Sequence, residues 1–162
     1  MELKTSLKVF NEADIPAGQG IVSGQIRKRL AGSPDHPSER IMAILATFQP
    51  GTLEPLHWHL VEAFHYVISG RAIVRDIEGH AYEVGPGSVI YAPPGITGSH
   101  EWDIQEQLQL IAFRATTDSE RSLQITVDPS TKQSKIELEQ LVGDLIVGGA
   151  VNFKKSLYES GA

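Results

Sequence analysis

The chain has 162 residues, about the length of one domain, and its 14 Lys and Arg against 20 Asp and Glu give a net charge of −6. It contains no cysteine, which excludes disulfide scaffolds, thiolate metal sites, iron–sulfur clusters and cysteine nucleophiles. The acidic balance, without any run rich in Lys and Arg, argues against binding to nucleic acid or to anionic membranes. Any metal chemistry must therefore rely on histidine and carboxylate side chains.

The N-terminal residues carry Glu2, Lys4 and Lys8 and no apolar core of signal-peptide length. The apolar stretches at 41–48 and 141–151 are shorter than a membrane span. We therefore expect a cytoplasmic protein with no nucleic-acid or membrane partner.

Gly and Pro punctuate the chain between short runs of strand-forming residues, which is typical of an all-β protein. Several runs alternate with a period of two, so that Leu108, Leu110 and Ala112 share one buried face. Strands are predicted over residues 21–30, 41–48, 52–59, 63–68, 72–77, 81–84, 88–91, 107–114 and 123–127.

A short C-terminal helix is predicted over residues 134–145, SKIELEQLVGDL. Its apolar residues fall mostly on one side, and Ser134 and Glu137 have the spacing of a capping box. Gly148 and Gly149 would end it. We expect this helix to pack on the rest of the domain or on a second copy of the chain, and to have no catalytic role.

Four of the six histidines, His57, His59, His65 and His100, fall within 44 residues. His57 and His59 lie two apart on a predicted strand, so both imidazoles project from the same face. Two nitrogens in this arrangement can bind one metal ion at about 2.0–2.1 Å without distorting the backbone. By itself the pair is weak evidence for a metal site, because two partly exposed histidines near a loop that bind nothing are the commoner case.

Two longer patterns surround these histidines. Residues 51–70, GTLEPLHWHLVEAFHYVISG, resemble the first motif of the cupin superfamily, which has a Gly, five residues, H-x-H, a Glu about four residues on, and a later Gly. Residues 85–100, GPGSVIYAPPGITGSH, resemble the second motif, which has a Gly, five residues, Pro-x-Gly, two residues and a His.

The cupin resemblance implies an all-β fold, a double-stranded β-helix or jelly-roll barrel just wide enough for a small ligand. It divides the single structural domain into N-terminal strands and a loop at 1–40, the barrel core at 41–128, and the C-terminal helix and tail at 129–162. Cupins commonly form homodimers through N-terminal strands, and residues 5–10 could serve in that way. The resemblance also implies one metal ion, held by two histidines and a Glu from the first motif and a histidine from the second.

Two of these ligand positions hold other residues, because Ala63 stands where the Glu is expected and Gly98 where the second-motif His is expected. In each case a histidine follows two residues later, His65 and His100, and a step of two preserves the direction of a side chain on a strand. If His59 faces Ala63 across a hairpin, then His57 faces His65. The metal ligands would then be His57, His65 and His100, with His59 as a fourth ligand or a neighbour of the ligands.

We expect a divalent transition metal (Fe, Mn, Ni, Cu or Zn) at such a nitrogen-rich site, and a dioxygenase-type oxidation of a small organic molecule. Glu62 or His65 would move protons. The alternatives are a cupin that binds or senses a small ligand without catalysis, with His65 and His100 as ordinary buried histidines, and a cupin isomerase or epimerase. An inward guanidinium on a strand, Arg71, Arg75 or Arg114, could hold a carboxylate substrate.

Overall fold

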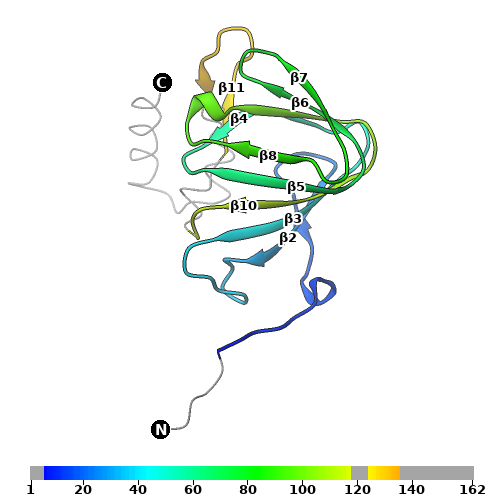
Figure 1. Cartoon of the computed structure of the whole chain (residues 1–162), viewed down its shortest axis with the longest axis vertical. Helices are drawn as coiled ribbons and strands as arrows, with labels where there is room; N and C mark the ends of the chain where they lie inside the picture. Colours follow the sequence, from blue (N-terminus) through cyan, green and yellow to red (C-terminus); the bar gives the residue numbers. More distant parts are fainter. Residues whose placement is uncertain (1–5, 118–123, 136–162) are drawn as a thin grey trace.

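A computed structural model describes residues 6–117 and 124–135, which form two antiparallel six-stranded sheets that face each other as a jelly roll (Figure 1). The first sheet has the order β1 (Gly18–Gln19), β2 (Gln25–Ala31), β3 (Met42–Phe48), β10 (Leu108–Arg114), β5 (Ala63–Ser69) and β8 (Val89–Ala92). The second has the order β12 (Ser134–Lys135), β11 (Gln124–Val127), β4 (Leu53–His59), β9 (His100–Ile104), β6 (Ala72–Asp76) and β7 (Ala81–Val84). The described residues also include two 3-10 turns, η1 (Glu12–Asp14) and η2 (Ile96–Gly98).

The main hydrophobic core lies between the two sheets and follows from the alternation of their strands. On β10, Leu108, Leu110 and Ala112 are buried as predicted, while the residues between them are partly exposed. They pack with Phe48 of β3 and Trp102 of β9, which are almost fully buried. Burial of such apolar side chains contributes about 25 cal/mol per Å² to folding, so these residues hold the sheets together around the interior.

The strands follow one another through tight turns, and Gly70 shows why one of these turns requires glycine. It joins β5 to β6, has a φ of +84°, and a Cβ added there would lie 2.0 Å from the carbonyl oxygen of Gln107. No amino acid other than glycine could adopt this backbone conformation with the Gln107 carbonyl oxygen so close. The chain therefore passes from one sheet to the other directly beside the start of β10.

The predicted strands are present with shifts of a few residues at their ends, and the all-β prediction is confirmed. The strand predicted over 21–30 begins only at Gln25, because the residues before it form turns. Strand β9 was not predicted, although it alternates buried and partly buried residues from His100 to Ile104.

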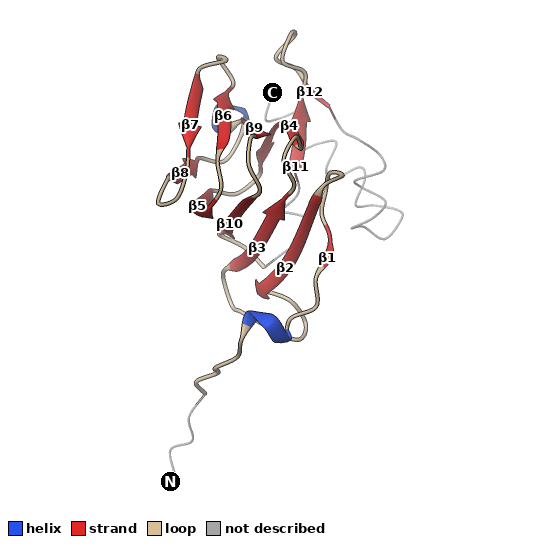
Figure 2. Cartoon of the chain, turned by 90° about the vertical axis from the view of Figure 1, so that its right-hand side faces the viewer, coloured by secondary structure: helices blue, strands red, loops and turns tan. Residues whose placement is uncertain are grey.

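The predicted C-terminal helix lies outside the described residues except for its first two. Ser134 and Lys135 form the short strand β12 instead (Figure 2). The Ser134 hydroxyl accepts a hydrogen bond from the Trp58 indole at 2.9 Å. Among the described residues there is no helix long and apolar enough to cross a membrane.

Candidate metal centre

Three buried histidines converge in the interior near one end of the barrel. His57 and His59 lie on β4, and His57 is the direct cross-strand partner of His100 on β9. The candidate donor atoms of these three residues all lie within 4.8 Å of one another. The His57 and His100 rings are 4.4 Å apart between centroids. This spacing suits three nitrogen ligands around one ion.

Hydrogen bonds orient two of these imidazoles. Nδ1 of His57 lies 2.6 Å from the Pro55 carbonyl oxygen, and Nδ1 of His100 lies 2.9 Å from that of Gly98. Because a carbonyl only accepts, each Nδ1 carries the proton and each Nε2 keeps its lone pair. This pairing of a ring N–H with a backbone carbonyl is common for histidines that bind metals.

The Nε2 atom of His100 is buried and has no hydrogen-bond partner among the described residues. Buried polar atoms are nearly always paired, so an unpaired lone pair beside two other imidazoles needs an explanation. A divalent transition metal would satisfy it, and three neutral imidazoles are a suitable donor set for such an ion. The residues present therefore fit the metal that the cupin resemblance implies.

The turn η2 brings His100 into position. It contains Gly98, the residue at the expected ligand position, and a Cβ on Gly98 would lie 1.9 Å from the Pro93 carbonyl oxygen. The chain therefore uses the two residues before His100 in a compact turn against Pro93. His100 then begins β9 with its side chain buried in the interior.

His65 lies on β5, in the opposite sheet, and its ring centroid is 5.2 Å from that of His100. The structure does not place it in the group formed by His57, His59 and His100. The predicted pairing of His59 with Ala63 and of His57 with His65 is wrong, because β4 and β5 belong to different sheets. The partners of His57 are His100 and Thr126, whereas His65 pairs with Ala112 and Ile90.

Arg114 connects the two sheets at this centre. It ends β10, is 91% buried, and its guanidinium donates to Nε2 of His59 at 3.0 Å and to Nε2 of His65 at 3.4 Å. Burial lowers the pKa of Arg114 to about 10, so the side chain remains a cation at neutral pH. The sequence pattern indicated Arg114 only as one of three strand arginines, since its contacts depend on the packing of the sheets.

The four histidines are neutral at physiological pH. Burial lowers the pKa of His57 and of His100 to about 3. Burial and the neighbouring Arg114 guanidinium also hold the pKa values of His59 and His65 well below the usual range. Neutral imidazoles are the form that binds metal ions.

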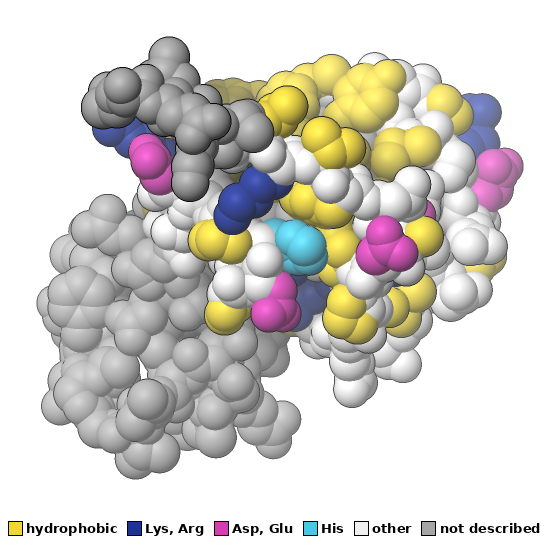
Figure 3. All heavy atoms as spheres, turned by 90° about the horizontal axis from the view of Figure 1, so that it is seen from below, with side chains coloured by type: hydrophobic (Ala, Val, Ile, Leu, Met, Phe, Trp, Pro, Cys, Tyr) yellow, Lys and Arg dark blue, Asp and Glu magenta, His cyan; other side chains and the backbone are white. Residues whose placement is uncertain are grey.

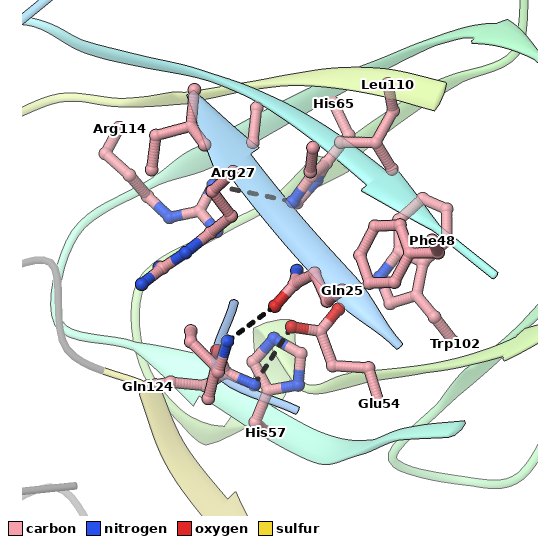
Figure 4. Close-up of a pocket in the computed structure, with 14 residues that line it drawn as sticks. Gln25, Arg27, Phe48, Glu54, His57, His65, Trp102, Leu110, Arg114 and Gln124 are labelled. Atoms are coloured by element: carbon pink, nitrogen blue, oxygen red, sulfur yellow. Dashed lines mark hydrogen bonds between the residues drawn. The ribbon is translucent and has the colours of Figure 1, made fainter. Parts of the chain in front are cut away.

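A small cavity of about 40 Å³ is lined in part by His57 and His65, and Glu54 is a buried acid in its wall (Figure 4). The Gln124 side chain of β11 donates to Glu54 at 3.2 Å. Burial raises the pKa of this carboxyl, against the attraction of the nearby cationic groups. Strict alternation would turn Glu54 away from His57, but the register of β4 against β9 shifts between these two residues. For this reason Glu54 could not be recognised from the sequence pattern.

Glu62, the predicted proton-transfer residue, is exposed. It accepts a hydrogen bond from the Tyr91 hydroxyl at 3.0 Å, on the outer side of the β5–β8 pair, and belongs to neither the histidine group nor the cavity wall. Among the residues that the structure describes, the buried carboxyl is Glu54.

Comparisons with known proteins agree with this architecture. Residues 44–113 match the cupin domain family. The polyketide cyclase RemF from Streptomyces resistomycificus has a similar structure, with a TM-score of 0.58 and 24% identity over 69% of this chain and 80% of that one. An RmlC-like cupin from Shewanella frigidimarina gives a TM-score of 0.59 with 19% identity, over 71% of this chain and 96% of that one.

An oxalate decarboxylase variant from Bacillus subtilis gives a TM-score of 0.59 with 22% identity, over 78% of this chain but only 34% of that chain. No curated protein matches the sequence. At these identities the likeness concerns the fold, and the chemistry must be argued from the residues of this chain.

Proposed function

Because this chain carries a cupin domain at residues 44–113 and so belongs to the cupin superfamily, we propose that it is a metal-dependent enzyme acting on a small organic molecule. The observation that carries the proposal is the group of three buried histidines whose donor atoms lie within 4.8 Å of one another. His57, His59 and His100 would hold the ion, with His65 as a fourth ligand or a neighbour. A bound divalent metal supplies Lewis acidity and, for a redox-active ion, a path for electrons.

We propose a dioxygenase-type oxidation as the first reaction to test. The candidate ligands are neutral nitrogens, without the carboxylate of the cupin pattern, and such sites suit Fe, Mn, Ni, Cu or Zn. Fe(II)-loaded protein should consume oxygen when mixed with a substrate from a panel of small carboxylates, enols and phenols. No uptake above the metal-free control across the panel would argue against oxidation.

A non-oxidative reaction is the second candidate, and Glu54 favours it. A buried carboxyl beside the histidines, with a raised pKa and a hydrogen bond from Gln124, is suited to give or take a proton at a bound substrate. Cyclisation and decarboxylation, named for two structurally similar proteins, and isomerisation or epimerisation all need such a group. Product formation without oxygen uptake would identify this class.

Metal analysis tests the central proposal. Purified protein incubated with Fe(II), Mn, Ni, Cu or Zn and desalted should retain about one ion per chain. His57→Ala and His100→Ala should each lose it, because each removes one of three ligands. His36→Ala is the matched control, since His36 stacks on Phe10 and belongs to neither group of side chains that could hold a metal ion. Wild-type protein that retains no metal would instead support a cupin that binds or senses a small ligand without catalysis.

We also propose a homodimer. The outer face of β5 and β8 exposes Phe64, Tyr66, Val89 and Tyr91 as neighbouring pairs, and hydrophobic side chains also gather on the face seen in Figure 3. The N-terminal segment at 6–10 extends away from the sheets (Figure 1). Light scattering on the full chain should give twice the monomer mass, and a monomer mass at micromolar concentration would contradict the proposal.

A further inference from the structure

We infer that Arg114 makes this centre selective for an anionic substrate, and that its guanidinium binds a carboxylate or enolate oxygen. This inference rests on the proposed function and names its substrate class. It starts from the position of Arg114, a buried guanidinium in the wall of the interior cavity beside His57, His65 and Glu54 (Figure 4).

The hydrogen bonds of Arg114 leave its charge without a direct anionic partner. Its N–H groups reach Nε2 of His59, Nε2 of His65 and the Phe113 carbonyl, which are all neutral acceptors. Within the described part of the chain, no carboxylate lies within salt-bridge distance of it. A buried charge is costly unless it is paired. Glu54 is close enough to interact electrostatically, but its own hydrogen bond comes from Gln124.

The acceptors of Arg114 are also candidate ligand atoms. A neutral imidazole has one lone pair, on Nε2 in His59 because this atom faces the arginine N–H. That lone pair cannot serve both a metal and Arg114. The metal-loaded protein therefore needs another acceptor for this N–H group, and an oxygen anion supplies one.

Charge balance leads to the same class of ligand. Three neutral histidines leave a divalent ion with its full charge of +2, and Arg114 adds a further positive charge on the same cavity. Glu54 can offset at most one of these charges, and burial favours its neutral form. An anionic substrate would lower this excess, and the fork of the guanidinium matches a carboxylate better than a single ammonium would.

The size of the cavity restricts what can enter. Its volume of about 40 Å³ is a few times the roughly 10–15 Å³ that one water molecule needs. Phe48, Trp102 and Leu110 form apolar walls around it. The space suits a carboxylate or enolate headgroup, and these walls disfavour additional charged groups on the substrate.

The test measures anion binding rather than turnover. Acetate and its uncharged isostere acetamide are titrated into Co(II)-loaded protein and followed by the visible cobalt spectrum, and into metal-free protein by calorimetry. In the wild type, acetate should bind and acetamide should not. Arg114→Gln should weaken acetate binding about tenfold or more, because a charge-assisted hydrogen bond is lost. Arg114→Lys should retain part of the affinity, because the charge remains.

Arg75→Gln is the matched control. Arg75 lies on β6 and pairs with Glu101 and Asp103 near the surface, so its loss should leave acetate binding unchanged. Circular dichroism and cobalt content show whether each variant is folded and loaded.

The outcomes separate this inference from the proposed function. If the wild type binds cobalt but Arg114→Gln binds acetate as tightly as it does, or acetamide binds equally well, the inference is overturned while the metal centre stands. If the wild type binds no metal, the proposed function fails. The calorimetric titration of the metal-free protein then tests the role of Arg114 by itself. Acetate binding that depends on Arg114 then supports anion binding by its guanidinium. Binding unaffected by Arg114→Gln, or no binding, overturns it.

Discussion

The four interior histidines all present the Nε2 lone pair to the interior. In His57 and His100 the Nδ1–H group donates a hydrogen bond to a backbone carbonyl, and in His59 and His65 the Nε2 atom accepts one from Arg114. Their pKa values lie far below neutrality because the rings are buried. The candidate ligands are thus neutral imidazoles, with a lone pair on one nitrogen, already in the metal-free protein.

This state predicts how few protons metal binding will release. At pH 6, three histidines with an ordinary pKa near 6.5 would carry about two protons in total and release them on binding. Here the release from the histidines should be close to zero. Calorimetric titration of Zn(II) into metal-free protein at pH 6, repeated in buffers of different ionisation enthalpy, measures the number directly. A release of two protons would contradict the buried, neutral state of the ligands.

Local irregularities, rather than regular strands, set the positions of the key side chains. The turn η2 shifts the second-motif histidine to His100, and the change of register in β4 brings Glu54 to the same side as His57. Each irregularity occupies only a few residues. A single substitution within one of them should therefore affect the centre without removing a ligand.

Gly98→Ala tests this for η2. The added methyl group would lie 1.9 Å from the Pro93 carbonyl oxygen, so the turn must shift and carry His100 with it. We expect a loss of about 1–3 kcal/mol in the free energy of unfolding, together with weaker metal binding. Gly85→Ala is the control, because its Cβ would meet only the Gly70 carbonyl oxygen at 3.8 Å. Chemical denaturation and metal titration of both variants measure the effect, and equal behaviour would show that the turn does not position His100.

Sequence patterns predicted the strands because alternation is a local property. The same local property identified His57 and His59 as interior residues, whereas the prediction for His100 came from the resemblance to the second cupin motif, because β9 was not predicted. The pairing of the strands was predicted wrongly, since β4 and β5 follow each other in the chain but join different sheets. Glu54 depends on an irregularity that alternation cannot show, and the contacts of Arg114 depend on packing between residues 49 and 55 positions apart in the sequence.

For the whole molecule, the buried histidines link stability to pH. Their pKa values are lower in the folded protein than in the unfolded chain, so the unfolded chain binds more protons as the pH falls below about 6.5. Stability from these groups is therefore present above that pH and is lost as the pH falls toward 3. The raised pKa of Glu54 acts in the opposite direction, but one carboxyl does not outweigh four imidazoles.

The metal-free protein should accordingly lose stability between pH 7.5 and pH 5. Each buried histidine contributes up to about 1.4 kcal/mol per pH unit once the pH is well below its unfolded pKa. Thermal unfolding followed by circular dichroism measures the trend. His100→Gln should show a shallower pH dependence than the wild type, since it removes one such group. A melting temperature that is constant over this range would contradict the prediction.

The hydrogen bond from Arg114 to His59 joins β10 of one sheet to β4 of the other, at the end of the barrel where the histidines lie. A substrate held by Arg114 and by the histidines of β4 and β9 would span the same gap. The motions that separate the two sheets at this end are therefore coupled to substrate binding at the histidine centre. Amide hydrogen exchange in β10 and β4 should slow together when the site is filled, although these strands share no backbone hydrogen bond.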